Sequence, residues 1–185
     1  MPILKEEPSL YPENLLDDVA PEPTNRRWWV LYTKARQEKA VSRELFAFKV
    51  PFFLPLVKKT STRRGRKVQS YVPLFGSYVF MYGSEEERVR SLTTNRISRS
   101  LTVDDVDSLV HDLRQLHQLI TSEAPLTVES RLVPGNKVRV LSGSFEGLEG
   151  TVLNRRGKVR LLVAINFLQQ GASVEIDDHL LEPIG

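Results

Sequence analysis

The sequence feature that most limits the possible folds is a series of glycine-containing turn signals in residues 134–185. They divide this part of the chain into short runs rich in aliphatic and β-branched residues, at residues 137–141, 150–154, 158–165 and 173–176. Short strand-like runs at such intervals, bounded by pairs such as Pro134-Gly135 and Arg156-Gly157, are typical of small β-barrels. The sequence therefore predicts a separate all-β domain, of a size that can fold alone with little stability to spare.

The preceding residues alternate between helical and strand-like periods. Residues 28–33 are rich in aromatic and β-branched side chains, which predicts a strand. In residues 35–48, apolar and basic side chains follow separate helical faces, with Val41, Leu45 and Phe48 on one and Arg36, Lys39 and Arg43 on the other. Further strands are predicted at residues 52–60, 67–75, 78–82 and 97–103, and further helices from Ser84 and at residues 106–120. This order predicts an α+β fold, in which helices pack against an antiparallel-rich sheet.

Composition divides the chain into four parts. Residues 1–24 hold five prolines among acidic residues and show no sustained period, so we interpret them as a mobile tail. Residues 25–122 are predicted to form the α+β domain. Residues 123–133 lack a clear period and contain Pro125, which predicts a linker to the β-domain of residues 134–185.

Positive charge is concentrated in one part of the chain. Residues 26–99 contain 17 Lys or Arg against 5 Asp or Glu, whereas the whole chain has a net charge of only +3. Residues 134–185 hold equal numbers of both signs, which argues against strong RNA binding by the β-domain alone. A solvated surface is the ordinary explanation of a run of charge, but an excess of this size favours a polyanionic partner such as nucleic acid.

Several kinds of active site find no support in the sequence. The chain has no cysteine, which excludes disulfides, zinc-thiolate sites and thiol catalysis, and its three histidines are scattered without ligand spacing. No phosphate-binding glycine loop or nucleophile motif is present, and helix capping explains the acidic cluster of Asp104, Asp105 and Asp107. We therefore expect no enzymatic activity, no metal and no cofactor. Without a signal peptide or a membrane-length apolar run, a monomeric cytoplasmic protein is expected.

Three motifs resemble those of the NusG family of transcription elongation factors. Two of them, Trp28-Trp29-Val30-Leu31-Tyr32 and the PLFGSYVF run of residues 73–80, are similar to the family's N-terminal (NGN) domain. The third, the VRVLSGSFEGLEGTV run of residues 138–152, is similar to its KOW motif, in which alternating residues lead to a glycine, here Gly150. The resemblance covers residues 26–184 and implies an SH3-like KOW barrel after the NGN domain. Because ribosomal proteins also carry KOW motifs, a ribosomal or RNA-binding KOW protein is the alternative.

Leu31-Tyr32 and residues 92–95 look more like the specialised, RfaH-like paralogues that regulate polysaccharide operons than like the housekeeping factor. The resemblance implies an elongation and antitermination factor that binds RNA polymerase, suppresses pausing and termination, and recruits a second partner through the KOW domain. The positions that grip the clamp helices of the polymerase hold Tyr32, Phe75 and Phe80, each of which could instead be an ordinary core residue. The turn proline of the family is missing at Gly76-Ser77, so we expect a looser turn with its bend at Gly76.

The resemblance implies further contacts. A polar motif would contact the polymerase across the DNA channel, at Arg90, Ser91, Thr93 and Thr94. Basic residues would meet the non-template DNA strand in the transcription bubble, at Lys34, Arg36, Lys39, Arg43, Arg96 and Arg99. Phe167 and Leu168 match the region of the KOW domain that binds ribosomal protein S10 or Rho. The alternative is a helix end for the polar motif, a solvated face for the basic residues, and barrel core for Phe167 and Leu168. The basic tip of residues 63–67 is interpreted as an electrostatic contact whose partner the sequence does not specify.

Overall fold

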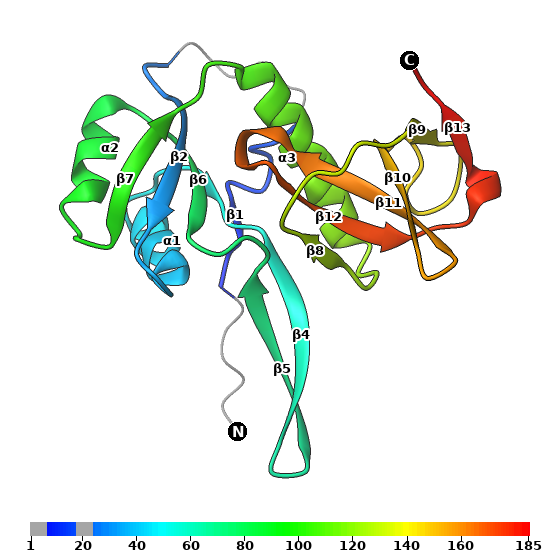
Figure 1. The fold of residues 1–185 in the computed structure, drawn as a ribbon. Helices are drawn as coiled ribbons and strands as arrows, with labels where there is room; N and C mark the ends of the chain where they lie inside the picture. The colour runs from blue at the N-terminus through cyan, green and yellow to red at the C-terminus, as the bar shows by residue number, and fades with distance from the viewer. Residues whose placement is uncertain (1–6, 18–23) are drawn as a thin grey trace. The chain divides into compact units, whose positions relative to one another are not determined.

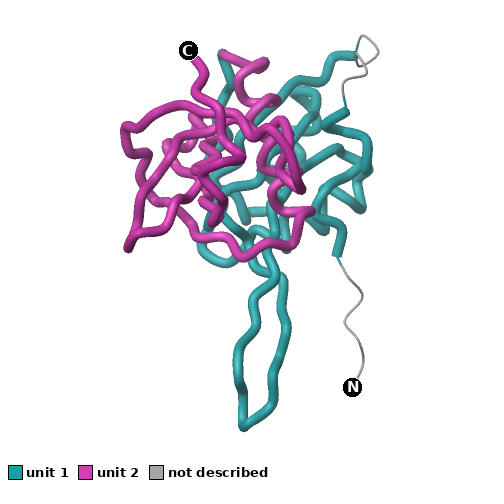
Figure 2. Tube along the Cα trace, turned by 90° about the vertical axis from the view of Figure 1, so that its right-hand side faces the viewer, with its two compact units in different colours: residues 1–104 teal, residues 105–185 magenta. Residues whose placement is uncertain are grey.

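The computed structural model describes residues 7–17 and 24–185 of the chain (Figure 1). Contacts within the chain group its residues into an N-terminal unit, residues 1–104, and a C-terminal unit, residues 105–185 (Figure 2). The described residues form three α-helices and antiparallel sheets, which confirms the predicted combination of helices with antiparallel strands.

The N-terminal unit is built on a five-stranded antiparallel sheet with the strand order β1-β3-β6-β2-β7. Its strands are β1 (Leu10–Tyr11), β2 (Arg27–Thr33), β3 (Phe52–Phe53), β6 (Tyr78–Gly83) and β7 (Ile97–Thr102). β2 lies between β6 and β7 and is apolar on both faces, because Trp28 and Val30 alternate with Trp29 and Leu31. A strand that is apolar on both faces is suited to the interior of a sheet.

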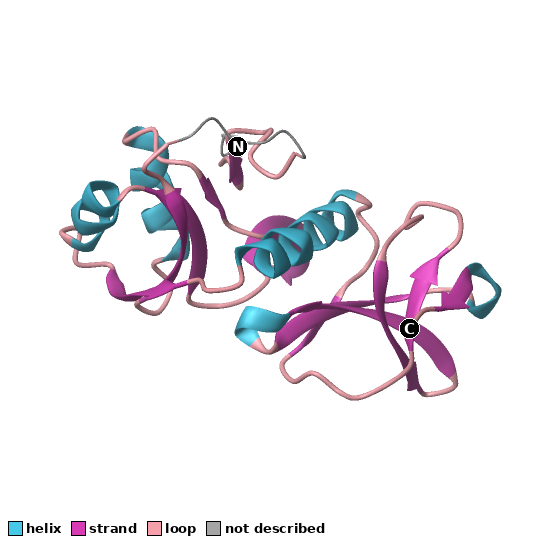
Figure 3. Cartoon of the chain, turned by 90° about the horizontal axis from the view of Figure 1, so that it is seen from above, coloured by secondary structure: helices cyan, strands magenta, loops and turns pink. Residues whose placement is uncertain are grey.

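Both helices of this unit pack on the same face of the sheet (Figure 3). α1 (Glu38–Ala47) and α2 (Glu85–Leu92) enclose a core with the strand residues Trp29, Leu31, Val79 and Met81. α2 begins with the predicted capping box, in which the Glu87 backbone N–H donates to Ser84 Oγ (3.1 Å) and the Ser84 backbone N–H donates to Glu87 Oε2 (2.8 Å). The opposite face of the sheet therefore has no helix of the N-terminal unit packed on it among the described residues.

A long hairpin forms a separate two-stranded sheet in the N-terminal unit. β4 (Leu56–Arg63) pairs with β5 (Arg66–Pro73) along its whole length, from the pair Leu56 and Pro73 to the pair Arg63 and Arg66. The turn consists of Arg64 and Gly65, whose φ angles of 49° and 74° are both positive. Two consecutive positive φ angles are typical of the type I′ turn, whose twist matches that of the paired strands.

The C-terminal unit combines α3 (Val106–Thr121) with a six-stranded antiparallel sheet of order β13-β9-β10-β11-β12-β8. The strands are β8 (Thr127–Glu129), β9 (Lys137–Val140), β10 (Glu149–Arg155), β11 (Lys158–Ile165), β12 (Gln170–Glu175) and β13 (Leu181–Pro183). Two short 3₁₀ turns, η1 (Asn166–Leu168) and η2 (Asp178–Leu180), connect the last strands. α3 packs against β11 and η1, and the backbone N–H of Asn166 donates to Asp112 Oδ2 (3.0 Å).

The predicted mobile tail contains an ordered segment. Leu10 and Tyr11 form β1, which pairs with Phe53 and Phe52 of β3. The ring of Tyr11 also packs edge-on against that of Phe46, with 5.1 Å between the ring centroids. These partners are far away in the sequence, which is why local composition did not reveal the strand. Residues 1–6 and 18–23 of the predicted tail lie outside the described residues.

α1 begins at Glu38, three residues later than the helical period predicts. Arg36 has a φ of 61°, which no right-handed helix contains, and the backbone N–H of Lys34 donates to the Arg96 carbonyl (2.8 Å). Residues 34–37 therefore form a turn held by the start of β7. The prediction that Arg36 shares a helix face with Lys39 and Arg43 is wrong.

The region around the predicted linker also differs. Thr127–Glu129, inside predicted linker residues 123–133, forms β8 and pairs with β12. α3, which the sequence places in the first domain, groups with the strands of the C-terminal unit. One contact that joins α3 to these strands is made by Gln115, whose Oε1 accepts a hydrogen bond from the Glu149 backbone N–H (2.7 Å). Whether the predicted domains fold independently stays a prediction.

Candidate functional site

The face of the N-terminal sheet opposite α1 and α2 carries rows of aromatic side chains. The strand register places Trp28 beside Tyr82 and Tyr32 beside Tyr78, on either side of the pair Val30 and Phe80. Phe53 of β3 lies beside Phe80 in the same central row. We call this surface the aromatic face and define it by seven residues: Trp28, Val30, Tyr32, Phe53, Tyr78, Phe80 and Tyr82.

Neighbouring rings of the aromatic face are in direct contact. The ring centroids are 5.5 Å apart for Trp28 and Tyr82 and 5.3 Å apart for Tyr32 and Tyr78. Such cross-strand aromatic pairs contribute about 0.2–1 kcal/mol each relative to a pair of alanines. Tyr32, Tyr78 and Tyr82 are half-buried, whereas the central Val30 and Phe80 are buried. The tyrosines at both ends of the face therefore offer accessible ring edges and hydroxyls.

The residues predicted to form one contact patch do not all lie on this face. Tyr32 and Phe80 belong to it, but Phe75 lies in the loop between β5 and β6 and is only 2% exposed. The burial of Phe75 and Phe80 agrees with the alternative that they are core residues, and their contact role stays a prediction. Sequence reasoning missed Trp28, Tyr78 and Tyr82, although the alternation of aromatic residues along both strands could have revealed them.

The loop before β6 turns at Gly76 and Ser77. Gly76 therefore lies in the turn, as predicted, but the left-handed conformation belongs to Ser77, which has a φ of 70°. Two hydrogen bonds hold the loop: the Ser77 backbone N–H donates to Glu38 Oε1 (2.7 Å), and the Thr33 backbone N–H donates to the Ser77 carbonyl (2.8 Å). α1 and β2 thus fix a turn that the missing proline led us to expect to be loose.

The polar motif at the end of α2 is largely engaged with the helix itself. The hydroxyls of Ser91, Thr93 and Thr94 donate to the backbone carbonyls of residues 88, 90 and 91, at 2.6, 2.6 and 2.8 Å. Ser91 is buried, whereas Arg90 and Thr93 are exposed. The guanidinium of Arg90 lies 3.8 Å from the ring centroid of Phe48. Arg90 and Thr93 are therefore the accessible members of the motif.

An ion pair anchors α2 to the start of β2. The guanidinium of Arg26 donates to Glu87 Oε1 from Nη2 (2.7 Å) and to Oε2 from Nε (3.1 Å). Burial alone would raise the pKa of Glu87, but the hydrogen bonds from Arg26 and from the Ser84 backbone outweigh it and hold the pKa below its ordinary value. The carboxylate of the capping box is therefore charged at neutral pH and also serves as a lock between two elements.

The predicted nucleic-acid-binding residues divide into engaged and available cations. Arg96 donates to Glu44 Oε1 (3.0 Å) and to Gln37 Oε1 (2.6 Å), and Arg43 pairs with Glu7 (3.4 Å). The other four have no carboxylate partner among residues 7–17 and 24–185: Lys34, Arg36, Lys39 and Arg99.

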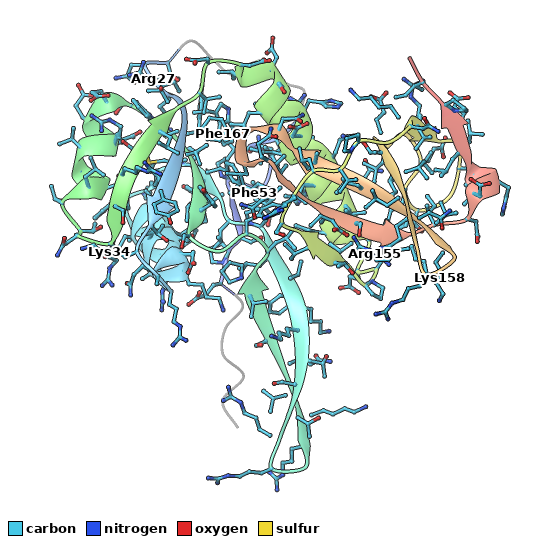
Figure 4. All side chains as sticks on the ribbon, viewed as in Figure 1. Arg27, Lys34, Phe53, Arg155, Lys158 and Phe167 are labelled. Carbon is cyan, nitrogen blue, oxygen red and sulfur yellow. The ribbon has the colours of Figure 1, made fainter. Side chains whose placement is uncertain are left out.

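Three of these available cations lie near the end of β2. Lys34 follows β2 and donates from Nζ to Asn95 Oδ1 (2.8 Å), and Figure 4 shows it at the end of the strand opposite Arg27. Arg36 lies in the same turn. The guanidinium of Arg99 lies 5.2 Å from the ring centroid of Tyr32. We call these three cations, together with Lys39 of α1, the basic group; it adjoins the aromatic face through Arg99 and Tyr32.

The predicted partner-binding residues of the C-terminal unit both lie in η1, and Figure 4 labels Phe167. Phe167 is 37% exposed and Leu168 is 9% exposed. The exposed ring suits a surface contact, and the buried Leu168 suits the core of the unit, which matches the alternative for that residue.

The described part of the chain offers no group of three or more His, Asp or Glu side chains placed to hold a metal ion. None of its helices combines the length and the apolar character needed to cross a membrane.

Comparisons with known proteins identify similar sequences and structures. A family model, described as "NusG: Transcription termination factor nusG", matches residues 26–134. A solved structure described as "Domain interaction in Thermotoga maritima NusG" is 18% identical, with 86% of this chain and 98% of that chain covered and a TM-score of 0.45. Another, "Crystal Structure of MjSpt4:Spt5 complex conformation B", is 13% identical, with 86% of this chain and 97% of that chain covered and a TM-score of 0.28.

Proposed function

Because the chain belongs to the NusG family, we propose that it is a transcription elongation and antitermination factor that binds RNA polymerase through the aromatic face. The observation that carries the proposal is a row of contacting aromatic rings on a sheet face that bears no helix of its own unit among the described residues. A face of this kind accepts the apolar stripe of an α-helix, which is the chemistry of a clamp helix laid into a groove.

Within this proposal the two ends and the centre of the face differ in role. Tyr32 and Tyr78 supply accessible ring surface and hydroxyls for the polymerase helix. Phe80 is buried at the centre of the face and shapes it from within, whereas Phe75 is buried in the loop before β6 and would support that loop. Arg90 and Thr93, with Ser91 and Thr94 supporting the helix end, would contact the polymerase at a second place, so that the factor bridges the cleft and suppresses pausing and termination.

The basic group would bind the non-template DNA strand in the transcription bubble. Lys34, Arg36, Lys39 and Arg99 have no carboxylate partner among the described residues, so their charges are available to phosphates. Arg43 and Arg96 are already paired with carboxylates and would contribute less. Because Arg99 lies over Tyr32, a DNA contact there would adjoin the polymerase contact.

The C-terminal unit would carry the KOW barrel of the family. Residues 138–152 span β9, β10 and the loop between them, and Gly150 pairs with Val138. A Cβ at Gly150 would collide with the carbonyl oxygen of Leu162, which supports a strict need for glycine at the end of the motif. Phe167 would contact ribosomal protein S10 or Rho, with Leu168 holding the turn in the core. Leu31-Tyr32 favours a specialised paralogue. We propose separately that the protein acts in the cytoplasm.

The experiment uses the full chain and core RNA polymerase. The double variant Tyr32→Ala with Tyr78→Ala removes the accessible rings of the aromatic face. The control is Phe46→Ala, because Phe46 is an aromatic residue of α1 that is 46% exposed on the helical side of the sheet. We expect the double variant to bind polymerase at least about tenfold more weakly, since it loses two aromatic anchors, and to stop shortening pauses on a defined template.

The control variant should bind polymerase and act on pauses as the unmodified chain does. Far-UV circular dichroism and thermal unfolding of each variant establish that the fold is retained. Equal binding by all three proteins would contradict the assignment of the aromatic face. No polymerase binding by the unmodified chain, with RNA or ribosome binding instead, would contradict the elongation-factor proposal and favour the RNA-binding alternative.

A further inference from the structure

The hairpin of β4 and β5, residues 56–73, which we call the basic hairpin, carries six cationic side chains and no acidic one. The six are Lys58, Lys59, Arg63, Arg64, Arg66 and Lys67. Every residue from 62 to 71 is exposed. The hairpin extends away from the five-stranded sheet of its unit (Figure 1).

None of these six cations has a carboxylate partner among the described residues. The hairpin of β10 and β11 provides an internal comparison, because it also turns through an Arg-Gly pair with two positive φ angles, at Arg156 and Gly157. There Arg155 pairs with Glu129 (2.9 Å) and Lys158 pairs with Glu175 (3.0 Å), and both cations are labelled in Figure 4. A hairpin with this kind of turn can therefore form while its cations are paired with carboxylates.

The arrangement of charge in the basic hairpin is unfavourable for the isolated chain. Arg63 and Arg66 form a directly opposite cross-strand pair, and Arg64 lies in the turn between them. Like charges placed opposite one another destabilise a hairpin. An anionic partner would offset the repulsion between these arginines. The charge pattern is therefore suited to binding an anion and does not help the hairpin to fold.

The dimensions of the basic hairpin match a groove of duplex DNA. Each strand has eight residues, which at about 3.3 Å per residue gives a length of roughly 26 Å. The major groove of B-form DNA is about 12 Å wide and admits a two-stranded β-ribbon. The register places Lys59, Arg63 and Arg66 on one face of the ribbon and Lys58 and Lys67 on the other. Each strand of a ribbon in such a groove lies beside one phosphate wall. Because β4 carries Lys58, Lys59 and Arg63 and β5 carries Arg66 and Lys67, their long side chains can reach the phosphates of both walls.

We propose that the basic hairpin binds duplex DNA by lying in its major groove, with its cations on the phosphates of both walls. Thr60, Thr62 and Gln69 lie on the face that carries Lys58 and Lys67, where their polar groups can reach base edges. This duplex site is additional to the single-strand contact of the proposed function and does not depend on polymerase binding.

Other polyanions fit the basic hairpin less well. Single-strand binding surfaces stack bases on several aromatic rings, whereas Tyr71 is the one aromatic residue of the hairpin. A membrane surface requires one continuous apolar face, but the exposed Val68 and Tyr71 lie on opposite faces of the ribbon. The major groove of duplex RNA is deep and narrow and does not admit side chains readily.

The test measures binding of the full chain to a short, fluorescently labelled DNA duplex of mixed sequence, by anisotropy over a series of salt concentrations. The hairpin variant combines Arg63→Gln, Arg64→Asn, Arg66→Gln and Lys67→Gln. The control variant removes four exposed cations of the C-terminal unit, through Arg131→Gln, Lys137→Gln, Arg156→Asn and Lys158→Gln, and so has the same net charge. Asparagine is used at both turn positions because it tolerates a positive φ.

We expect the hairpin variant to bind the duplex at least about 100-fold more weakly near 0.1 M salt and to lower the salt dependence, the slope of log K against log salt, by about 3 to 4. The control variant should lose less than about threefold, since it changes only the net charge. A second variant, Arg63→Lys with Arg64→Lys and Arg66→Lys, keeps the charge and should retain most of the affinity if phosphates are the ligands.

Equal losses in the hairpin and control variants would overturn the proposal, because net charge alone would then explain binding. A loss confined to single-stranded DNA, to duplex RNA or to vesicles of anionic lipid would also overturn it. Failure of the polymerase experiment leaves this result unaffected, since the duplex assay contains no polymerase.

Discussion

Ser77 adopts a left-handed backbone conformation, with a φ of 70°, in the turn that leads into β6. An L-residue in this region costs about 1–2 kcal/mol, which glycine avoids while losing more conformational entropy on folding. We therefore expect Ser77→Gly to raise the free energy of unfolding by about 0.5–1 kcal/mol. Urea-induced unfolding followed by circular dichroism measures the change.

The neighbouring Gly76 provides the control for this prediction. It has no positive φ, and a Cβ built on it would meet no atom within 4 Å. Gly76→Ala should therefore leave stability unchanged or raise it slightly. The prediction fails if Ser77→Gly destabilises the protein more than Gly76→Ala does.

Glu129 is a buried carboxylate, 7% exposed, that joins β8 to the rest of its sheet. Its Oε1 accepts hydrogen bonds from Arg155 Nη1 (2.9 Å) and Ser173 Oγ (2.6 Å), and Oε2 accepts from Arg155 Nη2 (3.0 Å). Burial alone would raise the pKa of Glu129, but these hydrogen bonds outweigh it and hold the pKa below the ordinary value of 4.5. The folded state thus binds a proton less readily than the unfolded state.

A lowered pKa means that the stabilisation is complete above pH 4.5 and is lost as the pH falls through the folded-state pKa. Glu129→Gln should lower the free energy of unfolding at pH 7 by about 1–2 kcal/mol, and this difference should shrink in acid. Unfolding curves between neutral and acid pH measure both effects. Glu182→Gln is the control, because Glu182 is more exposed and lies 3.6 Å from Arg139; an equal loss in the two variants would contradict the prediction.

At the scale of elements, α3 depends on Asp112 for its connection to η1. Asp112 Oδ2 accepts hydrogen bonds from the backbone N–H (3.0 Å) and the side-chain Nδ2 (3.2 Å) of Asn166. Burial raises the pKa of Asp112 above its ordinary 3.8, and the hydrogen bonds from Asn166 only partly oppose this. The contribution of Asp112 to stability is therefore largest below pH 3.8 and declines as the pH rises through the folded-state pKa.

Two substitutions separate the charge of Asp112 from its hydrogen bonds. Asp112→Asn retains an acceptor and removes the buried charge, so it should leave stability at pH 7 unchanged or slightly higher. Asp112→Ala leaves the Asn166 N–H without its partner and should cost about 1–3 kcal/mol. Thermal unfolding at neutral pH compares the variants. If both destabilise the protein equally, the ionised carboxylate is itself required.

Most elements could be predicted from local sequence, and the exceptions have one physical cause. The capping box of Ser84 and Glu87 and the apolar period of α3 are patterns within a few residues, and both occur as predicted. β1 and β8 were missed because each is held by partners distant in the sequence, Phe52 for Tyr11 and Arg155 for Glu129. The late start of α1 at Glu38 reflects the hydrogen bond from the Lys34 backbone N–H to the Arg96 carbonyl, which no local pattern contains.

For the whole molecule, the positive charge of residues 26–99 includes two separate groups of cations on the N-terminal unit. One is the basic group beside the aromatic face, and the other is the basic hairpin. Neutralising Lys34, Arg36 and Lys39 should weaken binding of single-stranded DNA by about tenfold near 0.1 M salt and leave duplex binding nearly unchanged. The hairpin variant should show the reverse pattern in the same anisotropy assay. Equal losses on both ligands in both variants would mean that the two surfaces act as one.

By itself, the sequence determined the family, the mixture of helices and antiparallel strands, and the concentration of positive charge in residues 26–99. These follow from composition, period and motifs, which short segments carry on their own. Only the tertiary structure decided which face of the sheet is left without a helix, which strands hold Glu129, and where α3 packs. It also separated Arg96, paired with Glu44, from Arg36 and Arg99, which have no such partner among the described residues. The reason is that register, burial and ion pairing join residues far apart in the chain, and they exist only once the elements have packed.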